Sequence, residues 1–254
     1  MIRIAARLAL LWVCLAVPAW AQTCRQTSHD GQSYAVCEVH AGDDLRLFLT
    51  DEAGATIGTF DRLRAMVAGQ GKRVVMAMNA GMYHPDRRPV GLYLENGQIG
   101  GRLVTRPGPG NFGMQPNGVF CIARDGFAVI ETLAYDRVRP ECRYASQSGP
   151  MLVIDGRLHP RFLPDSSSRF IRNGVGVSAD GQTAWLAISD RPVTFHEFAR
   201  LFRDALGARD ALYFDGRISR LYAPELGRDD FGFPMGPIVA LIAPADDGQT
   251  TGNR

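Results

Sequence analysis

The stretch at residues 174–214, GVGVSADGQTAWLAISDRPVTFHEFARLFRDALGARDALYF, contains the pattern that decides the fold. Its first half holds two strand-like runs, 174–178 and 183–188, on either side of the pair Asp180–Gly181. Asp-Gly pairs favour the tight turns whose twist suits two paired strands. We therefore predict a β-hairpin here.

The second half of this stretch predicts a helix followed by a strand. Thr194 and Glu197 have the spacing of a capping box. Apolar residues then recur at helical spacing up to Gly207, a natural C-terminal stop; they are Phe195, Phe198, Leu201, Phe202 and Leu206. Because a strand-like run at 211–214 follows closely, we expect the helix to pack on a sheet.

The same turn signal recurs along the chain. Asp-Gly or Asn-Gly pairs begin at Asp30, Asn96, Asn117, Asp125, Asp155, Asn173, Asp180 and Asp215. Strand-like runs at 73–78, 90–95, 118–123, 127–132 and 151–154 lie among them, and a weaker helix is expected at 61–67. We predict a single α+β domain with a β-rich mixed sheet, hairpins and a few packed helices.

Composition indicates a globular protein, since 46% of the 254 residues are hydrophobic and 21% are charged. Without Arg3 and Arg7, which lie in a predicted leader, 26 of the 28 basic residues remain, matching the 26 acidic ones. No excess of positive charge remains to bind the phosphate backbone of a nucleic acid, so we expect no nucleic-acid partner.

Residues 1–21 resemble a secretory signal peptide, with a positive start, a short apolar core and an Ala-Trp-Ala cleavage site. We therefore expect a periplasmic or secreted bacterial protein without stable membrane insertion after cleavage. The predicted mature domain spans 22–245, residues 246–254 are expected to form a disordered tail, and we expect a monomer or weak oligomer.

Four cysteines follow the leader: Cys24, Cys37, Cys121 and Cys142. In an exported protein they suggest two disulfides, with three pairings open. Proximity in sequence favours Cys24–Cys37 and Cys121–Cys142. A zinc site is the alternative, but the chain has no C-x-x-C and no histidine at ligand spacing, so no metal is expected.

Two familiar motifs lack the context that their function needs. Residues 108–113 match G-x-G-x-x-G, yet the prolines around them prevent the helix that a dinucleotide site requires. Residues 230–232 spell the kinase D-F-G without any other kinase motif.

Four other segments place polar residues where apolar strands end. Their candidate site residues are Asn79 and Gly81; Gln147, Ser148 and Gly149; Arg172 and Asn173; and Asp215, Gly216 and Ser219. Guanidinium groups, hydroxyls and glycine N–H groups bind phosphate oxygens well. A carboxylate at a strand end is suited to catalysis, although Asp215–Gly216 is equally readable as one more hairpin turn. The residues alone do not name a reaction.

The order of these motifs resembles the phosphodiester glycosidase domain family, in a bacterial exported branch. The resemblance covers about residues 45–243 and is carried by MNAGMY (78–83), GLYLENG (91–97), QSGPML (147–152), RNGVG (172–176), the helix at 194–206 and FDGRIS (214–219). The chain departs from the family pattern at Ala80, Asn173, Arg217 and Ile218.

The resemblance implies hydrolysis of a sugar-1-phosphodiester, in a small molecule or glycan, without a cofactor. Asp215 would be catalytic, with Glu95 as second candidate, and Arg172 with the Ser148–Gly149 amides would hold the phosphate. Asn79 and Ser219 would orient the substrate. Two alternatives stay open: a non-catalytic module that binds phosphorylated glycan, which the altered turn at Arg217 favours, and a phosphatase or nuclease, which would want a metal cluster.

Overall fold

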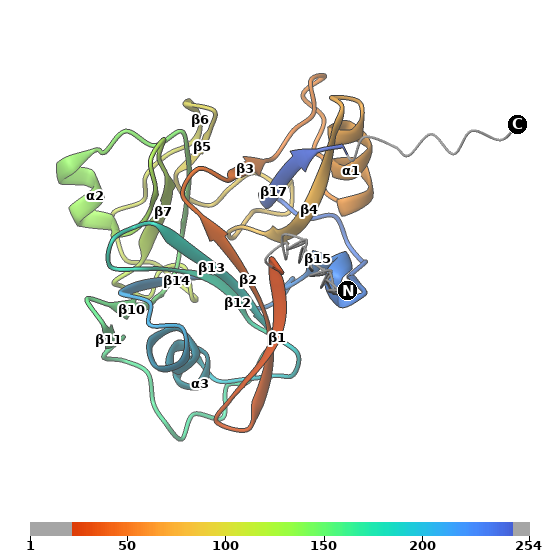
Figure 1. Cartoon of the computed structure of the whole chain (residues 1–254). Coiled ribbons are helices and arrows are strands. Elements are labelled where there is room, and N and C mark those ends of the chain that lie inside the picture. The colour runs from red at the N-terminus through yellow and green to blue at the C-terminus, as the bar shows by residue number, and fades with distance from the viewer. Residues whose placement is uncertain (1–21, 246–254) are drawn as a thin grey trace, which may run out of the picture.

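The computed structural model describes residues 22–245, which form three antiparallel sheets with helices at the periphery (Figure 1). The predicted signal peptide at 1–21 and the predicted tail at 246–254 lie outside the described residues. The largest sheet has seven strands in the order β1-β2-β13-β12-β14-β10-β11. They are β1 (Cys24–His29), β2 (Gln32–His40), β13 (Thr183–Ser189), β12 (Asn173–Val177), β14 (Asp210–Asp215), β10 (Met151–Ile154) and β11 (Arg157–Leu158).

The two other sheets have five strands each. One runs in the order β16 (Arg228–Asp229), β15 (Leu221–Ala223), β4 (Lys72–Asn79), β17 (Ile238–Pro244) and β3 (Asp44–Phe48). The other runs in the order β6 (Gln98–Gly101), β5 (Tyr93–Glu95), β9 (Tyr144–Ser148), β7 (Gly118–Ile122) and β8 (Phe127–Glu131). The fold is thus a single β-rich α+β domain, as the sequence predicts.

The helices are short. They are α1 (Phe60–Ala68), α2 (Thr132–Val138), α3 (Phe195–Arg200) with its π-helical continuation η1 (Leu201–Ala205), and the 3-10 turn η2 (Pro224–Leu226). The capping box predicted at Thr194 and Glu197 is present, with Glu197 N–H donating to Thr194 Oγ1 at 3.1 Å. The sequence misses α2 and predicts a strand up to residue 132. The strand ends at Glu131 instead, because its carboxylate accepts the N–H groups of Leu133 and Ala134 and so caps a helix.

The main core lies between the sheets, where side chains such as Met78, Phe120 and Phe214 are fully buried. Helix α3 with Phe198 and its continuation η1 with Phe202 cover the outer face of the seven-stranded sheet, and α1 packs separately against β4 (Figure 1). The buried residues of α1 are Phe60, Leu63 and Val67, which form one apolar stripe at helical spacing.

Five of the eight Asp-Gly and Asn-Gly pairs form the predicted hairpin turns. They begin at Asp30, Asn96, Asp125, Asp155 and Asp180, and each joins two antiparallel neighbours. The other three do not make hairpins: Asn117 precedes β7, Asn173 begins β12 and Asp215 ends β14. After Asp215 the chain leaves its sheet, and β15 pairs with β4 in another sheet. Asp215–Gly216 is therefore not one more hairpin turn.

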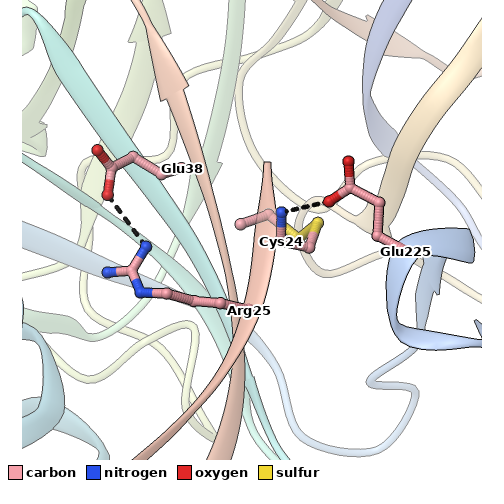
Figure 2. Close-up of a disulfide and its surroundings, with 5 residues drawn as sticks. Cys24, Arg25, Glu38 and Glu225 are labelled. Carbon is pink, nitrogen blue, oxygen red and sulfur yellow. Dashed lines mark hydrogen bonds and ion pairs between the residues drawn. A yellow bond between two sulfur atoms is a disulfide. The ribbon is translucent and has the colours of Figure 1, made fainter. Parts of the chain in front are cut away.

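Two disulfides join the pairs that sequence proximity favours, Cys24–Cys37 and Cys121–Cys142. Figure 2 shows the first, at partner positions of β1 and β2, with the backbone N–H of Cys24 donating to Glu225 at 2.8 Å. The hydrogen bond between Cys24 and Glu225 links β1, the first strand of the seven-stranded sheet, to η2. Between residues 22 and 245, no helix is long and apolar enough to cross a membrane.

Candidate active site

Four strand ends from all three sheets meet in one polar cluster. Asn79 ends β4, Ser148 ends β9, Asn173 begins β12 and Asp215 ends β14. Asn173 and Asp215 are partners in the sheet register, and Ser148 Oγ donates to the carbonyl of Phe214, next to Asp215, at 2.9 Å. The structure thus brings together one residue from each of the four predicted segments.

Two buried asparagines hold this cluster together. Asn173 Nδ2 donates to the backbone carbonyl of Asn79 at 2.8 Å and to its Oδ1 at 3.1 Å. Asn173 Oδ1 in turn accepts Ser219 Oγ and the N–H of Asp215, both at 3.2 Å. Because both asparagines are fully buried and every bond crosses between elements, this network fixes the seven-stranded sheet against β4.

Asp215 presents a carboxylate held by its own turn. Its Oδ1 accepts the N–H of Gly216 at 2.6 Å and that of Arg217 at 2.9 Å. Partial burial raises the pKa of Asp215, although these backbone donors act in the opposite direction. The carboxylate forms no ion pair with any residue between 22 and 245. A carboxyl group with a raised pKa and no cationic partner has the character of a general base.

Tyr83 lies beside this carboxylate. Burial raises the pKa of its phenol, and the negative charge of Asp215 raises it further, while Arg87 and Arg220 lower it. The Tyr83 hydroxyl reaches the carbonyl of Pro234 at 3.4 Å. A phenol, a carboxylate and two guanidinium groups therefore share one neighbourhood.

Arg172 lies beneath the Asp215 turn and is fully buried. Its Nε donates to Val193 O at 2.9 Å and its Nη2 donates to Ser168 O at 3.1 Å, while its Cζ lies 3.7 Å from the centre of the Phe195 ring. Burial lowers its pKa. In this arrangement the guanidinium supports the site from behind, and its predicted contact with phosphate stays a prediction.

Tyr213 fills the space between Arg172 and the turn. Its hydroxyl occupies the position that a Cβ on Gly216 would need, so a larger residue at 216 would displace it. Among residues 22–245, neither the Tyr213 hydroxyl nor Arg172 Nη1, both buried, has a hydrogen-bond partner.

Three further predicted residues, Gln147, Gly149 and Gly81, have contacts within the fold. The Gln147 side chain makes four hydrogen bonds within the chain, to Leu92 N, Val104 N, Val104 O and Thr132 Oγ1. Gly81 packs against Ser146 Oγ, and Gly149 packs against Asn117 Cβ. A ligand contact by Gln147 would have to replace one of these bonds.

Glu95 lies apart from this cluster. Its carboxylate accepts Tyr93 Oη at 2.7 Å and the N–H of Leu49 at 3.1 Å, and burial raises its pKa despite the bond from Tyr93. Neither bond reaches the Asp215 network, so Glu95 has the weaker geometry for a shared site. Within residues 22–245, no three His, Cys, Asp or Glu side chains are grouped to hold a metal ion.

A groove of about 1190 Å³ lies at the end of the third sheet that is away from Ser148. Its lining includes Tyr144, at the start of β9, whereas Ser148 ends the same strand. None of the predicted site residues lines this groove.

Sequence alone predicts no role for Tyr83, Tyr213 or Arg220. Only their positions in the chain point to two of them: Tyr83 lies in the segment after β4, and Arg220 directly follows Ser219. The backbone N–H of Arg220 donates to Asn79 Oδ1 at 2.9 Å, which only the tertiary structure reveals.

Comparison with known proteins finds a family model, a curated protein and a solved structure that are similar to this chain. The family model described as phosphodiester glycosidase matches residues 72–229. The uncharacterized protein YigE of Escherichia coli strain K12 is 38% identical over 178 residues, which are 70% of this chain and 69% of that protein. The zebrafish N-acetylglucosamine-1-phosphodiester alpha-N-acetylglucosaminidase catalytic domain, auto-inhibited by pro-peptide, superposes with a TM-score of 0.60 at 13% identity, covering 86% of this chain and 81% of that one.

Proposed function

The chain belongs to the phosphodiester glycosidase family, and from this premise we propose that it hydrolyses a sugar-1-phosphodiester at the glycosyl C–O bond. The observation that carries the proposal is the Asp215 carboxylate, partly buried and free of ion pairs within 22–245, where four strand ends meet. Such a group is placed to act on a ligand rather than to stabilise the fold.

In the proposed reaction, water attacks the anomeric carbon while Asp215 takes up the proton of that water. The bond between the anomeric carbon and the bridging oxygen breaks, and its electron pair leaves with the phosphate monoester, whose P–O bond stays intact. Phosphate is a good leaving group, so the reaction needs little protonation of the departing oxygen. Asp215 also stabilises the positive charge that develops at the sugar ring.

Asn79 and Ser219 serve in this proposal as positioning residues. Their side chains are bound to Asn173 and to the Asp215 turn, so they set where the carboxylate lies. Glu95 stays the second candidate for a catalytic carboxylate. It is the weaker one because its carboxylate already accepts hydrogen bonds from Leu49 and Tyr93.

We further propose that the protein acts outside the cytoplasm, on an envelope or extracellular glycan. Two disulfides support this location, because such bonds persist in oxidising compartments and are rare in the cytosol.

The test is hydrolysis in oxygen-18 water. Residues 22–254, purified from an oxidising compartment, are incubated with a panel of sugar-1-phosphodiesters that includes UDP-N-acetylglucosamine. Label in the free sugar supports cleavage of the glycosyl C–O bond. Label in the phosphate would mean P–O cleavage and a different class of enzyme. Binding with a shift in melting temperature but without turnover of any substrate would favour the non-catalytic binding module.

A further inference from the structure

A phosphodiester carries a negative charge, so the proposed reaction needs a cation that can reach it. Three arginines near the cluster are occupied or buried, whereas Arg87 and Arg217 form no ion pair among residues 22–245. Arg169 makes a two-pronged ion pair with Glu197, at 3.0 and 2.8 Å, and Arg228 pairs with Asp190 and Asp230. Arg172 is fully buried behind the turn.

Arg220 differs from Arg169 and Arg228 in its pairing and from Arg172 in its exposure. It forms no ion pair with a carboxylate among residues 22–245, and its one side-chain hydrogen bond runs from Nη1 to the carbonyl of Phe233 at 2.6 Å. Its guanidinium is partly exposed. A guanidinium has five N–H donors, so most of them are available to an anion.

The backbone ties Arg220 to the reactive cluster. Its N–H donates to Asn79 Oδ1 at 2.9 Å, and the preceding residue, Ser219, donates to Asn173 Oδ1 at 3.2 Å and to Asp215 O at 2.8 Å. The guanidinium therefore starts from a fixed point within the network that holds the carboxylate.

The loop after β16 fixes the direction of the guanidinium. Gly232 has a φ of +144°, and a Cβ at this position would overlap Arg220 Nη2. Phe233 O accepts from Nη1 on the same side. The Tyr83 hydroxyl donates to Pro234 O, next to the Phe233 carbonyl that accepts from Arg220, and the charges of Arg220 and Asp215 both act on the Tyr83 phenol.

We propose that Arg220 binds the phosphate oxygens of the substrate, while Arg172 positions the Asp215 turn from beneath. The assignment rests on the proposed function. A guanidinium without a carboxylate partner gains a charge-assisted and bidentate contact when a phosphate arrives, whereas the occupied arginines would have to break an existing one. The same contact stabilises the growing charge on the departing phosphate monoester.

The experiment compares Arg220→Ala, Arg220→Lys and a matched control, Arg209→Ala. Arg209 is an exposed arginine that pairs with Asp155 next to the opposite end of β14. Binding of inorganic phosphate is measured by calorimetry, and kcat and KM are measured on any sugar-1-phosphodiester that the wild type hydrolyses.

We expect Arg220→Ala to weaken phosphate binding at least tenfold and to lower kcat/KM about 100-fold, the usual effect of losing one donor to a transition-state charge. Arg220→Lys keeps the charge without the planar guanidinium, so its phosphate affinity and kcat/KM should lie between those of the wild type and Arg220→Ala. Arg209→Ala should stay within about twofold of the wild type. If Arg220→Ala does not fold, Arg220→Lys and Arg220→Gln decide by the same phosphate measurement.

The outcomes separate this inference from the proposed function. Hydrolysis by the wild type with unchanged phosphate affinity and KM in folded Arg220 variants would overturn the inference and leave the function standing. Absence of phosphate binding to the wild type would also overturn it. Phosphate binding that depends on Arg220, in a protein that hydrolyses no sugar-1-phosphodiester, would support the anion site and count against the proposed function.

Discussion

Asp215 is held by backbone N–H groups of its own turn rather than by a cation. This arrangement orients the carboxylate without neutralising it, whereas an arginine partner would lower its pKa and its basicity. The charge is therefore kept at some cost to the folded state, as is common for groups that act on a ligand.

Asp215→Asn should lower kcat by a factor of about 10² to 10⁴, the usual contribution of general base catalysis. The variant should at the same time be more stable at neutral pH. Burial raises the pKa of Asp215 in the folded state above its unfolded value, so the ionised carboxylate destabilises the native protein above that pKa. Denaturant unfolding at pH 7 checks the stability, and the gain should shrink as the pH falls and the wild-type carboxyl becomes protonated. A variant with wild-type kcat would remove Asp215 from the mechanism.

The pH dependence of kcat/KM should follow the same group. A base must be ionised, so activity rises with pH through the pKa of Asp215. Because burial raises that pKa, the acidic limb should lie above the value of about 4 expected for a solvated aspartate. Rates measured from about pH 3 to about pH 8, which spans that value, give the limb directly. A limb at or below pH 4 would contradict the assignment.

At the scale of elements, β14 positions the candidate site because it lies between β12 and β10 in the seven-stranded sheet. Its last residue pairs with the first residue of β12, and α3 packs over the outer face of the same sheet. The β12–β13 hairpin, α3 and β14 follow one another along the chain. This order determines both the neighbours of β14 in the sheet and the residue that ends it, Asp215. Stability of α3 should then affect the site through β14.

Thr194→Ala should destabilise the protein by about 1 kcal/mol, since it removes the oxygen that caps α3. Thr59→Ala is the matched comparison, because Thr59 caps α1 with a longer bond of 3.3 Å and without a reciprocal glutamate. We expect the loss at Thr194 to be the larger of the two in urea unfolding. Equal losses would mean that the Glu197 half of the capping box contributes nothing.

At the scale of the whole molecule, three sheets close around one core and one polar cluster. The Asn79–Asn173 bonds join two of the sheets, and the Ser148 bond to Phe214 joins the third. The disulfides lie elsewhere: Cys24–Cys37 links β1 to β2, and Cys121–Cys142 links β7 to the segment before β9. Covalent links and the site are thus separate features of the fold.

The double variant Cys121→Ser and Cys142→Ser should lose about 3 kcal/mol of unfolding free energy, the value expected for releasing a loop of this length; the two cysteines are 21 residues apart. KM should not change, because Cys121 lies in β7, toward its end away from Gly118. Denaturant unfolding without reductant and steady-state kinetics on the folded fraction measure the two effects. A raised KM with unchanged stability would contradict this separation.

The sequence by itself determined the local elements and the residues available for chemistry. Hairpin turns at Asp30 and Asp180 and the capping box at Thr194 follow from contacts within a few residues, and such short-range preferences are legible in a single chain. The four polar segments and the family resemblance were also visible there, and the family match bears the resemblance out.

Only the tertiary structure decided which of these signals are hairpin turns and which lie in the polar cluster. Asn173–Gly174 and Asp215–Gly216 have the same dipeptide pattern as the hairpins. The Asn173 side chain, however, bonds to the backbone N–H of Asp215 and to Asn79, 94 residues earlier in the chain. The roles proposed for Arg172 and Arg220 also rest on the tertiary structure, which buries Arg172 and bonds the backbone of Arg220 to Asn79. Long-range packing sets burial and charge pairing, and neither is encoded in the spacing of neighbouring residues.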